Sequence, residues 1–551
     1  MATGSELTYN TSASAMQMAN AIFGDGVKVI SASYSGDPSS SAIYSRGDSR
    51  APEATPSDSG VILSTGRVTD FTQSWGDPNT SSSTSTDTWG VNNNTAFNAL
   101  AGTNTYDAAL LDVTFVPTGN VMTIQFTFSS EEYPEYINSA YNDMIGVWIN
   151  GSPVEMSAGN GDVSVTNING GNNANLYINN TGDSYNTEMD GFTLTLTLTI
   201  PVNSGVSNSI RIGIADVSDS RYDSNLLIAG DSIQTTLVAL EDQMTMGLGG
   251  NRILDVLGND VNTTGGTLTI TQINGVSVHP GDSVTLPSGD VITLNSDGTL
   301  NVHTDQDADD VSFTYQVTSS TGATDIGMVT VHTVPCFARG TRILTPEGLR
   351  PVEDLCPGDL VLTRDQGAQP LRWIGARSVP ARGAMAPVHL AAGALGAHGA
   401  LTLSPQHRIL LREPRAELLF GVSEVLVAAK DLVDGDQIIR QEVEEITYLH
   451  LLFDRHQVIW SEGLATESFR PGPQVMTGME AAVQAEILAL FPELCPLTGE
   501  GYGPAARRLL KQHEVQVLLA EGPLHRQPAE EALMCPNLAP PRAPQPDRRA
   551  A

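Results

Sequence analysis

Hydrophobic and polar residues alternate with a period of two over much of residues 1–236. The clearest alternations lie at 121–128, 192–200 and 210–214, between clusters of Gly, Asn and Ser. Runs of β-branched and aromatic residues with this period are typical of half-buried antiparallel strands. We therefore expect residues 1–236 to form a β-sandwich, with one short helix at 13–23.

The strand pattern continues through residues 238–334 in shorter segments. Turn sequences such as Asn259-Asp260 and Asp297-Gly298 separate these segments. The short, regular spacing predicts a second, Ig-like β-sandwich. Strands are expected at 267–270, 283–286, 291–294, 300–303, 311–317 and 328–334.

The pattern changes in the last third of the chain. Short strands alternate with Pro-Gly-Asp and Glu-Gly turns through 336–472, which predicts a third all-β module. The hydrophobic spacing in 473–551 is helical: Thr477-Gly-Met-Glu480 fits a capping box, and a second helix is expected from about Pro504 to Gly522. Residues 536–551 are rich in Pro, Ala and Arg, which predicts disorder. The predicted fold is mainly β: two N-terminal β-sandwich domains, an all-β module and a short α-helical C-terminal tail.

The charge changes at the same boundary. The chain has 551 residues and a net charge of -34, from 28 Lys and Arg against 62 Asp and Glu. Only seven of these bases, but 36 of the acids, precede Cys336, and no other cysteine precedes it. An acidic chain without a basic block is not expected to bind nucleic acid by neutralising phosphates. No apolar run reaches about 18 residues, so no transmembrane segment is expected.

The N-terminal segment has neither a basic region nor a continuous apolar stretch, so it does not fit a Sec-type signal peptide. Residues 1–335 nevertheless have an extracellular composition: acidic, lysine-poor, cysteine-free and rich in Ser, Thr, Asn and Gly. We expect a secreted or cell-surface protein that is exported without a signal peptide. A cell-surface or extracellular-matrix partner fits that location. The alternative is retention in the cytoplasm.

Two acidic stretches, 129–146 and 214–224, each follow a predicted strand of the first domain. Carboxylates that converge repel one another, and Ca²⁺ relieves the repulsion by binding their oxygens. The alternative is that these acids cap turns and solvate loops. Residues 76–95, which include an unbroken Ser/Thr run, are expected to form a mobile loop. The candidate Ca²⁺ ligands are Glu131, Glu132, Asp143, Asp216, Asp219 and Asp223.

These acidic stretches resemble the choice-of-anchor L family. The resemblance rests on Ser130-Glu-Glu-Tyr-Pro-Glu-Tyr136, Asp190-Gly-Phe-Thr193 and Ile214-Ala-Asp-Val217, and it covers most of residues 1–235. The family occurs on exported bacterial proteins that carry varied C-terminal anchoring or processing modules. Membership implies a non-catalytic β-sandwich presented outside the cell, and it does not identify a ligand.

The middle domain resembles the Ig/cadherin-like modules of bacterial adhesins. The resemblance rests on Asp255-Val-Leu-Gly-Asn-Asp260, on 268–271 and on 311–317. It implies a spacer. The Asn259-Asp260 turn and the acidic residues at 305–310 could hold Ca²⁺ between modules, or they are ordinary turn acids.

Cys336 stands where the third module begins. A thiolate there can attack the preceding carbonyl and convert the amide to a thioester, which is an N-to-S acyl shift. The departing amine needs a proton, and Ser404-Pro-Gln-His407 offers a histidine with a hydroxyl three positions earlier. Asp454 and His456 offer further polar groups. Singly, each residue also fits a structural role. Zinc is not expected, because the chain has no Cys-x-x-Cys pair.

In this order the residues resemble the Hint (hedgehog/intein) fold, in its bacterial Hint-like branch, over about 334–472. The matching segments include 336–341, 352–359, 372–375, 404–407 and 450–459. The resemblance implies an all-β horseshoe whose first residue is the thioester-forming nucleophile. Carried over, Cys336 is the nucleophile, Ser404 and His407 activate the Pro335-Cys336 junction, and His456 matches a downstream family histidine.

The chain departs from inteins at its end, where Thr466-Glu-Ser-Phe469 stands in place of His-Asn. No asparagine can cyclise, so complete splicing is not expected. Leu449 stands where inteins often carry a carboxylate, and whether Asp454 replaces that carboxylate stays open. We expect single-turnover self-cleavage before Cys336, with water or an unknown nucleophile as acyl acceptor and no cofactor. The alternative is a calcium-dependent surface adhesion or anchoring protein with a catalytically silent Hint fold.

Overall fold

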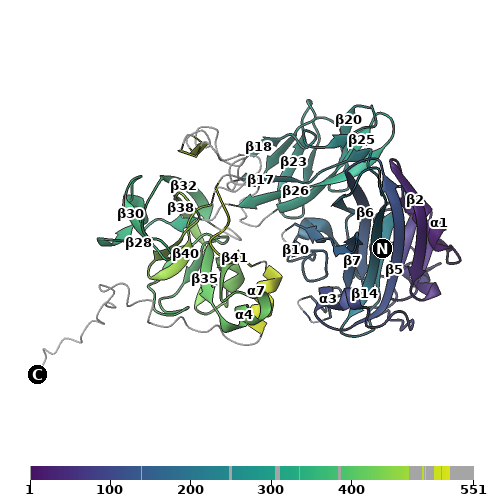
Figure 1. Ribbon diagram of the computed structural model, residues 1–551, viewed down its shortest axis with the longest axis horizontal. Helices are drawn as coiled ribbons and strands as arrows, with labels where there is room; N and C mark the ends of the chain where they lie inside the picture. Colours follow the sequence, from purple (N-terminus) through teal and green to yellow (C-terminus); the bar gives the residue numbers. More distant parts are fainter. Residues whose placement is uncertain are drawn as a thin grey trace, which may run out of the picture. The chain divides into compact units, whose positions relative to one another are not determined.

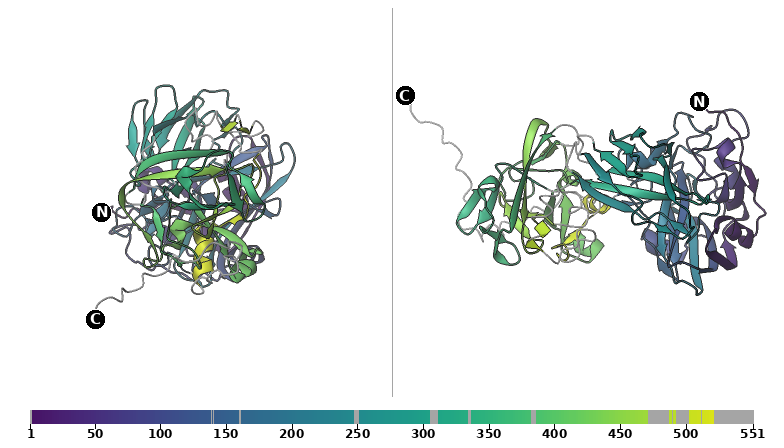
Figure 2. Two further views of the ribbon diagram at one scale, coloured as in Figure 1. Left: turned by 90° about the vertical axis from the view of Figure 1, so that its left-hand side faces the viewer. Right: turned by 90° about the horizontal axis from the view of Figure 1, so that it is seen from above.

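The computed structural model shows mostly strands and a few short helices (Figures 1 and 2). This confirms the predicted mainly β fold. The chain divides into two compact units. The front unit takes up most of residues 1–331, and the rear unit begins at His332 and also includes Thr245 and Met246. The structure describes residues 2–470 except 138, 140, 160, 247–250, 305–310, 334–335 and 382–385, and also 487–488, 490–491, 502–510 and 512–520.

The front unit begins with a sandwich of two antiparallel sheets. One has the order β1-β3-β4-β15-β6-β12-β11, with β13 also paired to β6, and the other has the order β2-β5-β14-β7-β8. A separate hairpin joins β9 and β10. The strands are β1 (Thr8–Asn10), β2 (Val27–Ser35), β3 (Ser41–Ser45), β4 (Ser59–Ser64), β5 (Thr105–Pro117), β6 (Val121–Ser130), β7 (Met144–Ile149), β8 (Ser152–Pro153), β9 (Ser157–Ala158), β10 (Gly161–Asp162), β11 (Tyr177–Asn179), β12 (Gly191–Thr193), β13 (Leu196–Pro201), β14 (Asn208–Val217) and β15 (Ser224–Ala229), and the helices are α1 (Ala15–Ile22), α2 (Gly47–Arg50) and α3 (Thr95–Ala101).

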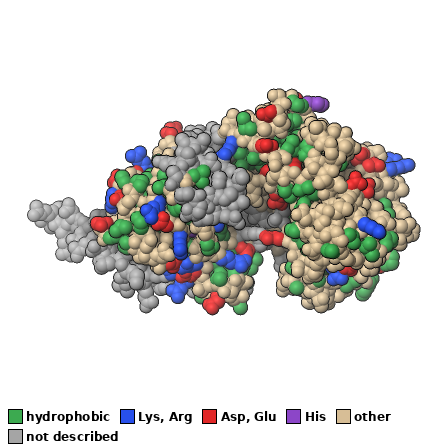
Figure 3. Space-filling model, turned by 45° about the horizontal axis from the view of Figure 1, so that its top comes forward, with side chains coloured by type: hydrophobic (Ala, Val, Ile, Leu, Met, Phe, Trp, Pro, Cys, Tyr) green, Lys and Arg blue, Asp and Glu red, His purple; other side chains and the backbone are tan. Residues whose placement is uncertain are grey.

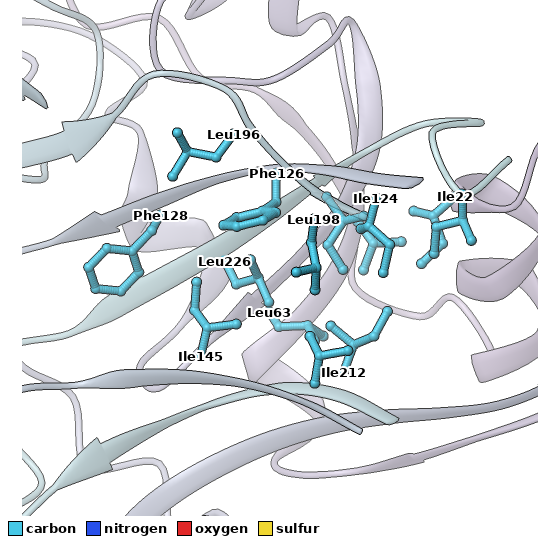
Figure 4. Packing of buried hydrophobic residues seen from close by; sticks show 14 of the residues in the cluster. Ile22, Leu63, Ile124, Phe126, Phe128, Ile145, Leu196, Leu198, Ile212 and Leu226 are labelled. Atoms are coloured by element: carbon cyan, nitrogen blue, oxygen red, sulfur yellow. The ribbon is translucent and has the colours of Figure 1, made fainter. Parts of the chain in front are cut away.

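Buried aliphatic and aromatic side chains from both sheets fill the space between them (Figure 4). In the β6–β13 pair, Phe126 faces Leu196 and Ile124 faces Leu198 across the register. Ile212 of β14 comes from the opposite sheet and points into the same core. The period-two alternation thus directs one face of each strand to the interior.

Two local predictions for the first domain have different outcomes. The predicted helix is present as α1, and the Ser14 side chain and Gln17 form a capping box at its N-terminus. The predicted strand at 192–200 is divided instead, because β12 ends at Thr193 and β13 begins at Leu196.

The front unit also contains the Ig-like pair of sheets, with orders β17-β26-β25-β20-β21 and β18-β24-β23-β22. The buried Asp325 of β26 joins this part to the first sandwich. It accepts hydrogen bonds from Gln125 Nε2 at 2.8 Å and Thr123 Oγ1 at 3.2 Å, both on β6. The strands are β16 (Leu237–Val238), β17 (Asp242–Met246), β18 (Asn251–Leu254), β19 (Val261–Asn262), β20 (Leu268–Ile273), β21 (Val276–Ser277), β22 (Ser283–Thr285), β23 (Val291–Leu294), β24 (Leu300–His303), β25 (Val311–Ser319) and β26 (Thr324–Thr333).

The rear unit has two further sheets. Their orders are β32-β38-β27-β34-β33-β37 and β29-β28-β39-β40-β35-β36-β41, and β30 and β31 extend the second sheet. The long strands β32 and β38 lie side by side (Figure 1). The elements are β27 (Phe337–Ala338), β28 (Arg342–Thr345), β29 (Gly348–Pro351), β30 (Leu360–Thr363), β31 (Gly367–Pro370), β32 (Trp373–Ala381), β33 (Val388–Leu390), β34 (Leu401–Leu403), β35 (Arg408–Arg412), α4 (Pro414–Phe420), β36 (Glu424–Ala428), β37 (Ile438–Arg440), β38 (Val443–Leu452), β39 (Val458–Ser461), β40 (Leu464–Glu467), β41 (Arg508–Leu509) and α7 (Gln512–Ala520).

The described parts of the C-terminal tail pack on the rear unit. Helix α7 contributes Val515 and Leu518 to its core. The prediction of a helix from about Pro504 is wrong for the first residues, because Arg508–Leu509 form strand β41, which pairs in parallel with β36. The helix itself begins at Gln512. The predicted capping box at 477–480 and the tail at 536–551 lie outside the described residues.

Candidate functional site

Strand β27 begins directly after the candidate nucleophile and lies between β34 and β38. Phe337 pairs with Leu403 on one side and with Leu449 on the other, and both pairings are antiparallel. Antiparallel strands run in opposite directions, so the residue before Phe337 lies opposite the residue after Leu403 and opposite the residue after Leu449. The register therefore brings Ser404 and His450 to the two sides of the cysteine.

Cys336 is buried, at 7% exposure, and contacts both neighbours. Its backbone N–H donates to Ser404 Oγ at 2.8 Å, and its carbonyl accepts the Ser404 N–H at 3.1 Å. Its Sγ lies 3.6 Å from His450 Nε2. The amide nitrogen is the group that an acyl shift releases, and Sγ is the atom that attacks. Ser404 thus contacts the leaving atom and His450 the attacking atom.

His407 closes the turn that presents Ser404, and its N–H donates to the Ser404 carbonyl at 3.0 Å. Its buried ring packs on Phe337 with a centroid distance of 4.3 Å. Burial lowers the pKa of His407 to about 4, although the nearby Glu467 acts in the opposite direction. Neither ring nitrogen makes a hydrogen bond within the described part of the chain. The ring is therefore neutral at pH 7 and able to exchange a proton.

Glu467 is a buried carboxylate that the sequence prediction did not include. Burial on its own would raise its pKa, but the charge of Arg408 and the hydrogen bond from His456 outweigh burial and lower the pKa to about 2. Its Oε1 accepts the Arg408 N–H at 2.9 Å, and its Oε2 lies 3.4 Å from His456 Nε2. The ionised Glu467 carboxylate lies near His407, and its charge stabilises the protonated form of that ring.

His456 does not join the group around Cys336, contrary to the prediction. Its Nδ1 accepts the Ala506 N–H at 3.0 Å, and its Nε2 donates to the Ser468 carbonyl at 3.1 Å. Both ring nitrogens are occupied. His456 thus contacts Glu467, the Ser468 carbonyl and the described tail residue Ala506.

Asp454, the other candidate polar group, lies at the surface. It follows the end of β38, and its two carboxylate oxygens accept from Arg372 at 2.7 and 2.8 Å. Its side chain is 52% exposed. Leu449 is part of the hydrophobic core. The residue of β38 that faces Cys336 is His450. It directly follows the buried Leu449, and the alternation of side chains along a strand is the sequence signal that could have indicated that the two residues face opposite sides.

Family models match three consecutive parts of the chain. A Hint domain matches residues 335–473, a choice-of-anchor L domain matches 7–234, and a bacterial Ig domain matches 228–332. The cysteine module is a Hint domain. The Hint fold is a self-processing fold, and the other two domains indicate a surface or extracellular protein.

Several solved structures are similar to the Hint domain. The gp41-1 intein is 12% identical, covers 24% of this chain and 98% of its own, and has a TM-score of 0.16. The AceL NrdHF class 3 split intein is 18% identical, with 24% and 97% coverage and a TM-score of 0.18. The bacterial intein-like domain from Clostridium thermocellum is 15% identical, with 24% and 97% coverage and a TM-score of 0.17. No curated protein matches the chain.

No helix among the described residues is long and apolar enough to cross a membrane. On the face shown in Figure 3, Lys and Arg side chains are sparse over the front unit and more frequent over the Hint domain. This distribution agrees with the charge boundary at Cys336.

The predicted Ca²⁺ ligands lie in two neighbouring groups, and the charge of Asp223 in the second group acts on Asp216 in the first. The first contains Glu132, Asp143 and Asp216. Glu132 Oε2 accepts the Asp143 N–H at 3.2 Å, and Asp143 Oδ2 accepts from Ser224 Oγ at 2.7 Å. Burial raises the pKa of Asp143 to about 7 and that of Asp216 well above its usual range. Asp219 lies near this group but is less buried.

Glu131 and Asp223 belong to the second group, together with Glu188 and Asp190, which the sequence prediction did not include. Within the described residues, no three Asp, Glu, His or Cys side chains are already arranged around a metal position. In the Ig-like domain, Asp260 shares the Tyr315 hydroxyl with Asp242. The acidic residues at 305–310 lie outside the described residues.

Proposed function

We propose that the Hint domain cuts the chain before Cys336 by an N-to-S acyl shift, and that the acidic front region is released or transferred outside the cell. The observation that carries the proposal is the pair of contacts at Cys336. Ser404 Oγ lies 2.8 Å from its amide nitrogen, and His450 Nε2 lies 3.6 Å from its Sγ.

The first step needs a thiolate. His450 is within reach of the thiol proton, and a thiolate attacks far more readily than a thiol. The sulfur attacks the carbonyl carbon of Pro335, which lies outside the described residues. A carbon–sulfur bond forms, and the carbonyl oxygen takes the negative charge of the tetrahedral intermediate.

The second step releases the amine. The carbonyl re-forms as the bond between the Pro335 carbonyl carbon and the Cys336 nitrogen breaks, and the nitrogen takes up one proton, which balances the proton that the thiol gave to His450. His407 is the neutral, buried imidazole next to the Cys336 backbone, and it can relay this proton while the Glu467 carboxylate stabilises its charged form. Ser404 Oγ holds the nitrogen in place. The product is a thioester at Cys336 with a free α-amine.

The third step removes the front region. Water, or another nucleophile, attacks the thioester carbonyl and breaks the carbon–sulfur bond. Hydrolysis leaves a carboxylate on Pro335 and a free thiol and amine on Cys336. Where inteins place a cyclising asparagine, this chain has the ion-paired Glu467, so cleavage rather than splicing is the expected end.

Export rests on the two front domains. Choice-of-anchor L and bacterial Ig modules are typical of surface proteins, and the front region has few lysines and no cysteine. Cleavage at its C-terminal border would detach the whole surface-facing part in one event. The acceptor of the acyl group is water or a nucleophile of the cell surface.

The test is a time course of the purified full-length protein with and without a thiol. Wild type should give fragments of 335 and 216 residues, and Cys336→Ala should stay intact. Cys356→Ala is the matched control, because Cys356 is an exposed free cysteine, and this variant should be cut as wild type is. If wild type stays intact under thiol, the Hint domain is silent and the surface-binding alternative stands.

A further inference from the structure

The end of strand β6 carries the most unusual charged group of the front unit. Glu131 directly follows the strand and is completely buried. Neither of its carboxylate oxygens makes a hydrogen bond within the described part of the chain. A buried carboxylate without a partner is costly, because it loses hydration and gains nothing in return.

Backbone hydrogen bonds fix Asp223 beside Glu131. The Glu131 N–H donates to the Asp223 carbonyl at 3.2 Å. Asp223 Oδ1 accepts the Thr86 N–H at 2.7 Å, while Oδ2 is buried and makes no hydrogen bond to a described residue. The Asp223 carboxylate lies against Gly66, and a Cβ at that position would overlap it. Glycine at position 66 therefore leaves the space that this carboxylate occupies.

Two further acids complete the group. Glu188 and Asp190 are buried, and their charges act on Glu131. Among the described residues, none of the four acids forms an ion pair with Lys or Arg; the ion pairs lie elsewhere in the chain. Four buried carboxylates without a cation repel one another strongly, because the screening inside a protein is weak.

The Ser/Thr-rich loop at 76–88, part of the segment 76–95 that was expected to be a mobile loop, lies over these acids. Thr80 donates to Glu188 from its N–H at 3.1 Å and from its hydroxyl at 2.9 Å. Asn79 Nδ2 donates to Asp190 at 2.6 Å. The loop supplies hydroxyl and amide groups together with the acids Asp77 and Asp87, and it contains no Lys or Arg.

We propose that Glu131 and Asp223, with Glu188 and Asp190 beside them, bind Ca²⁺ beneath this loop. Ca²⁺ takes six to eight oxygen ligands in flexible geometry, which suits carboxylates supplemented by hydroxyls and backbone carbonyls. Mg²⁺ requires a near-ideal octahedron and fits such a set less well. The oxygens do not yet converge on one point, so the cation has to draw them together against their repulsion.

This site also has a consequence for the protein surface. Trp75 and Trp89 stand at the two ends of the loop, and they are 82% and 83% exposed. A cation that fixes the loop onto the acids would fix both indole rings on the surface. Their fluorescence then reports on Ca²⁺ binding.

The experiment uses full-length protein carrying Cys336→Ala, stripped of metal with EDTA and titrated with Ca²⁺ by calorimetry. We expect binding by the parent protein, a change in tryptophan fluorescence and a rise in the melting temperature of the front unit on the order of 5 °C at saturation. Glu131→Gln and Asp223→Asn should each weaken binding at least about tenfold. Glu132→Gln is the matched control, because this neighbouring buried acid belongs to the other group, and it should bind as the parent does.

Glu131→Gln also guards against a folding artefact. It replaces the carboxyl group by an amide of the same shape, so the metal-free variant should fold and melt near the temperature of the metal-free parent. The proposal is overturned if the stripped parent takes up no Ca²⁺, which would mean that protons alone neutralise the acids, or if Glu131→Gln binds unchanged. These outcomes are independent of Hint cleavage, which the parent protein cannot perform.

Discussion

His407 links the stability of the Hint domain to pH. Its pKa is lowered from 6.5 to about 4 in the folded protein. As pH falls, the unfolded chain takes up a proton near pH 6.5, whereas folded His407 resists protonation until about pH 4. The stabilisation is therefore fully present above pH 6.5 and is lost progressively as pH falls to about 4. At 1.36 kcal/mol per pKa unit, the full loss is about 3 kcal/mol.

Between pH 7 and pH 5, His407 is expected to contribute a loss of about 2 kcal/mol. His398 adds to the total loss, because burial lowers its pKa as well. Glu467 acts in the same direction, but its pKa is lowered from 4.5 to about 2, so its contribution falls mainly below pH 5. Urea unfolding of the Cys336→Ala protein at both pH values measures the loss for the Hint transition. His407→Leu cannot be protonated at this position and should lose about 2 kcal/mol less than the parent. His279→Gln is the control, because the His279 side chain is 88% exposed. Equal losses in the parent and in His407→Leu would refute the reasoning.

Three further predictions concern single side chains. His450→Phe should slow thiol-induced cleavage about 100-fold without lowering the unfolding free energy of the Hint domain, as measured by gel time course and denaturation; an unchanged rate would remove His450 from the mechanism. Asp454→Ala should leave the cleavage rate within about twofold of wild type, since it loses only an exposed ion pair with Arg372. Asp325→Ala should destabilise the front unit by about 1–3 kcal/mol in denaturant melts, because Gln125 and Thr123 lose their buried acceptor.

The sequence grouped Cys336, Ser404 and His407 by their spacing and order, and the structure brings the three residues together. It missed His450, because the pairing of β27 with both β34 and β38 joins segments far apart in the chain. Asp454 was chosen for its chemical type, but it lies beyond the end of β38, where its side chain is solvated. The alternation of hydrophobic and polar residues does not indicate which polar side chain near the end of a strand faces Cys336.

The acids show the same limit of sequence reasoning. Along the chain, Glu131 and Glu132 are adjacent and were assigned to one group. Successive residues at a strand end point to opposite sides, so Glu131 joins Asp223 and Glu132 joins Asp143. The overall architecture was easier to predict, because strand alternation and turn spacing depend on local sequence.

The most direct test of the central claim is the intact mass of the thiol-treated wild-type protein. The account predicts two species: a 335-residue fragment that ends at Pro335 and a 216-residue fragment that begins with Cys336. Both should be absent from Cys336→Ala. A single mass for the whole chain at every time point, or a cut at any other bond, would contradict it.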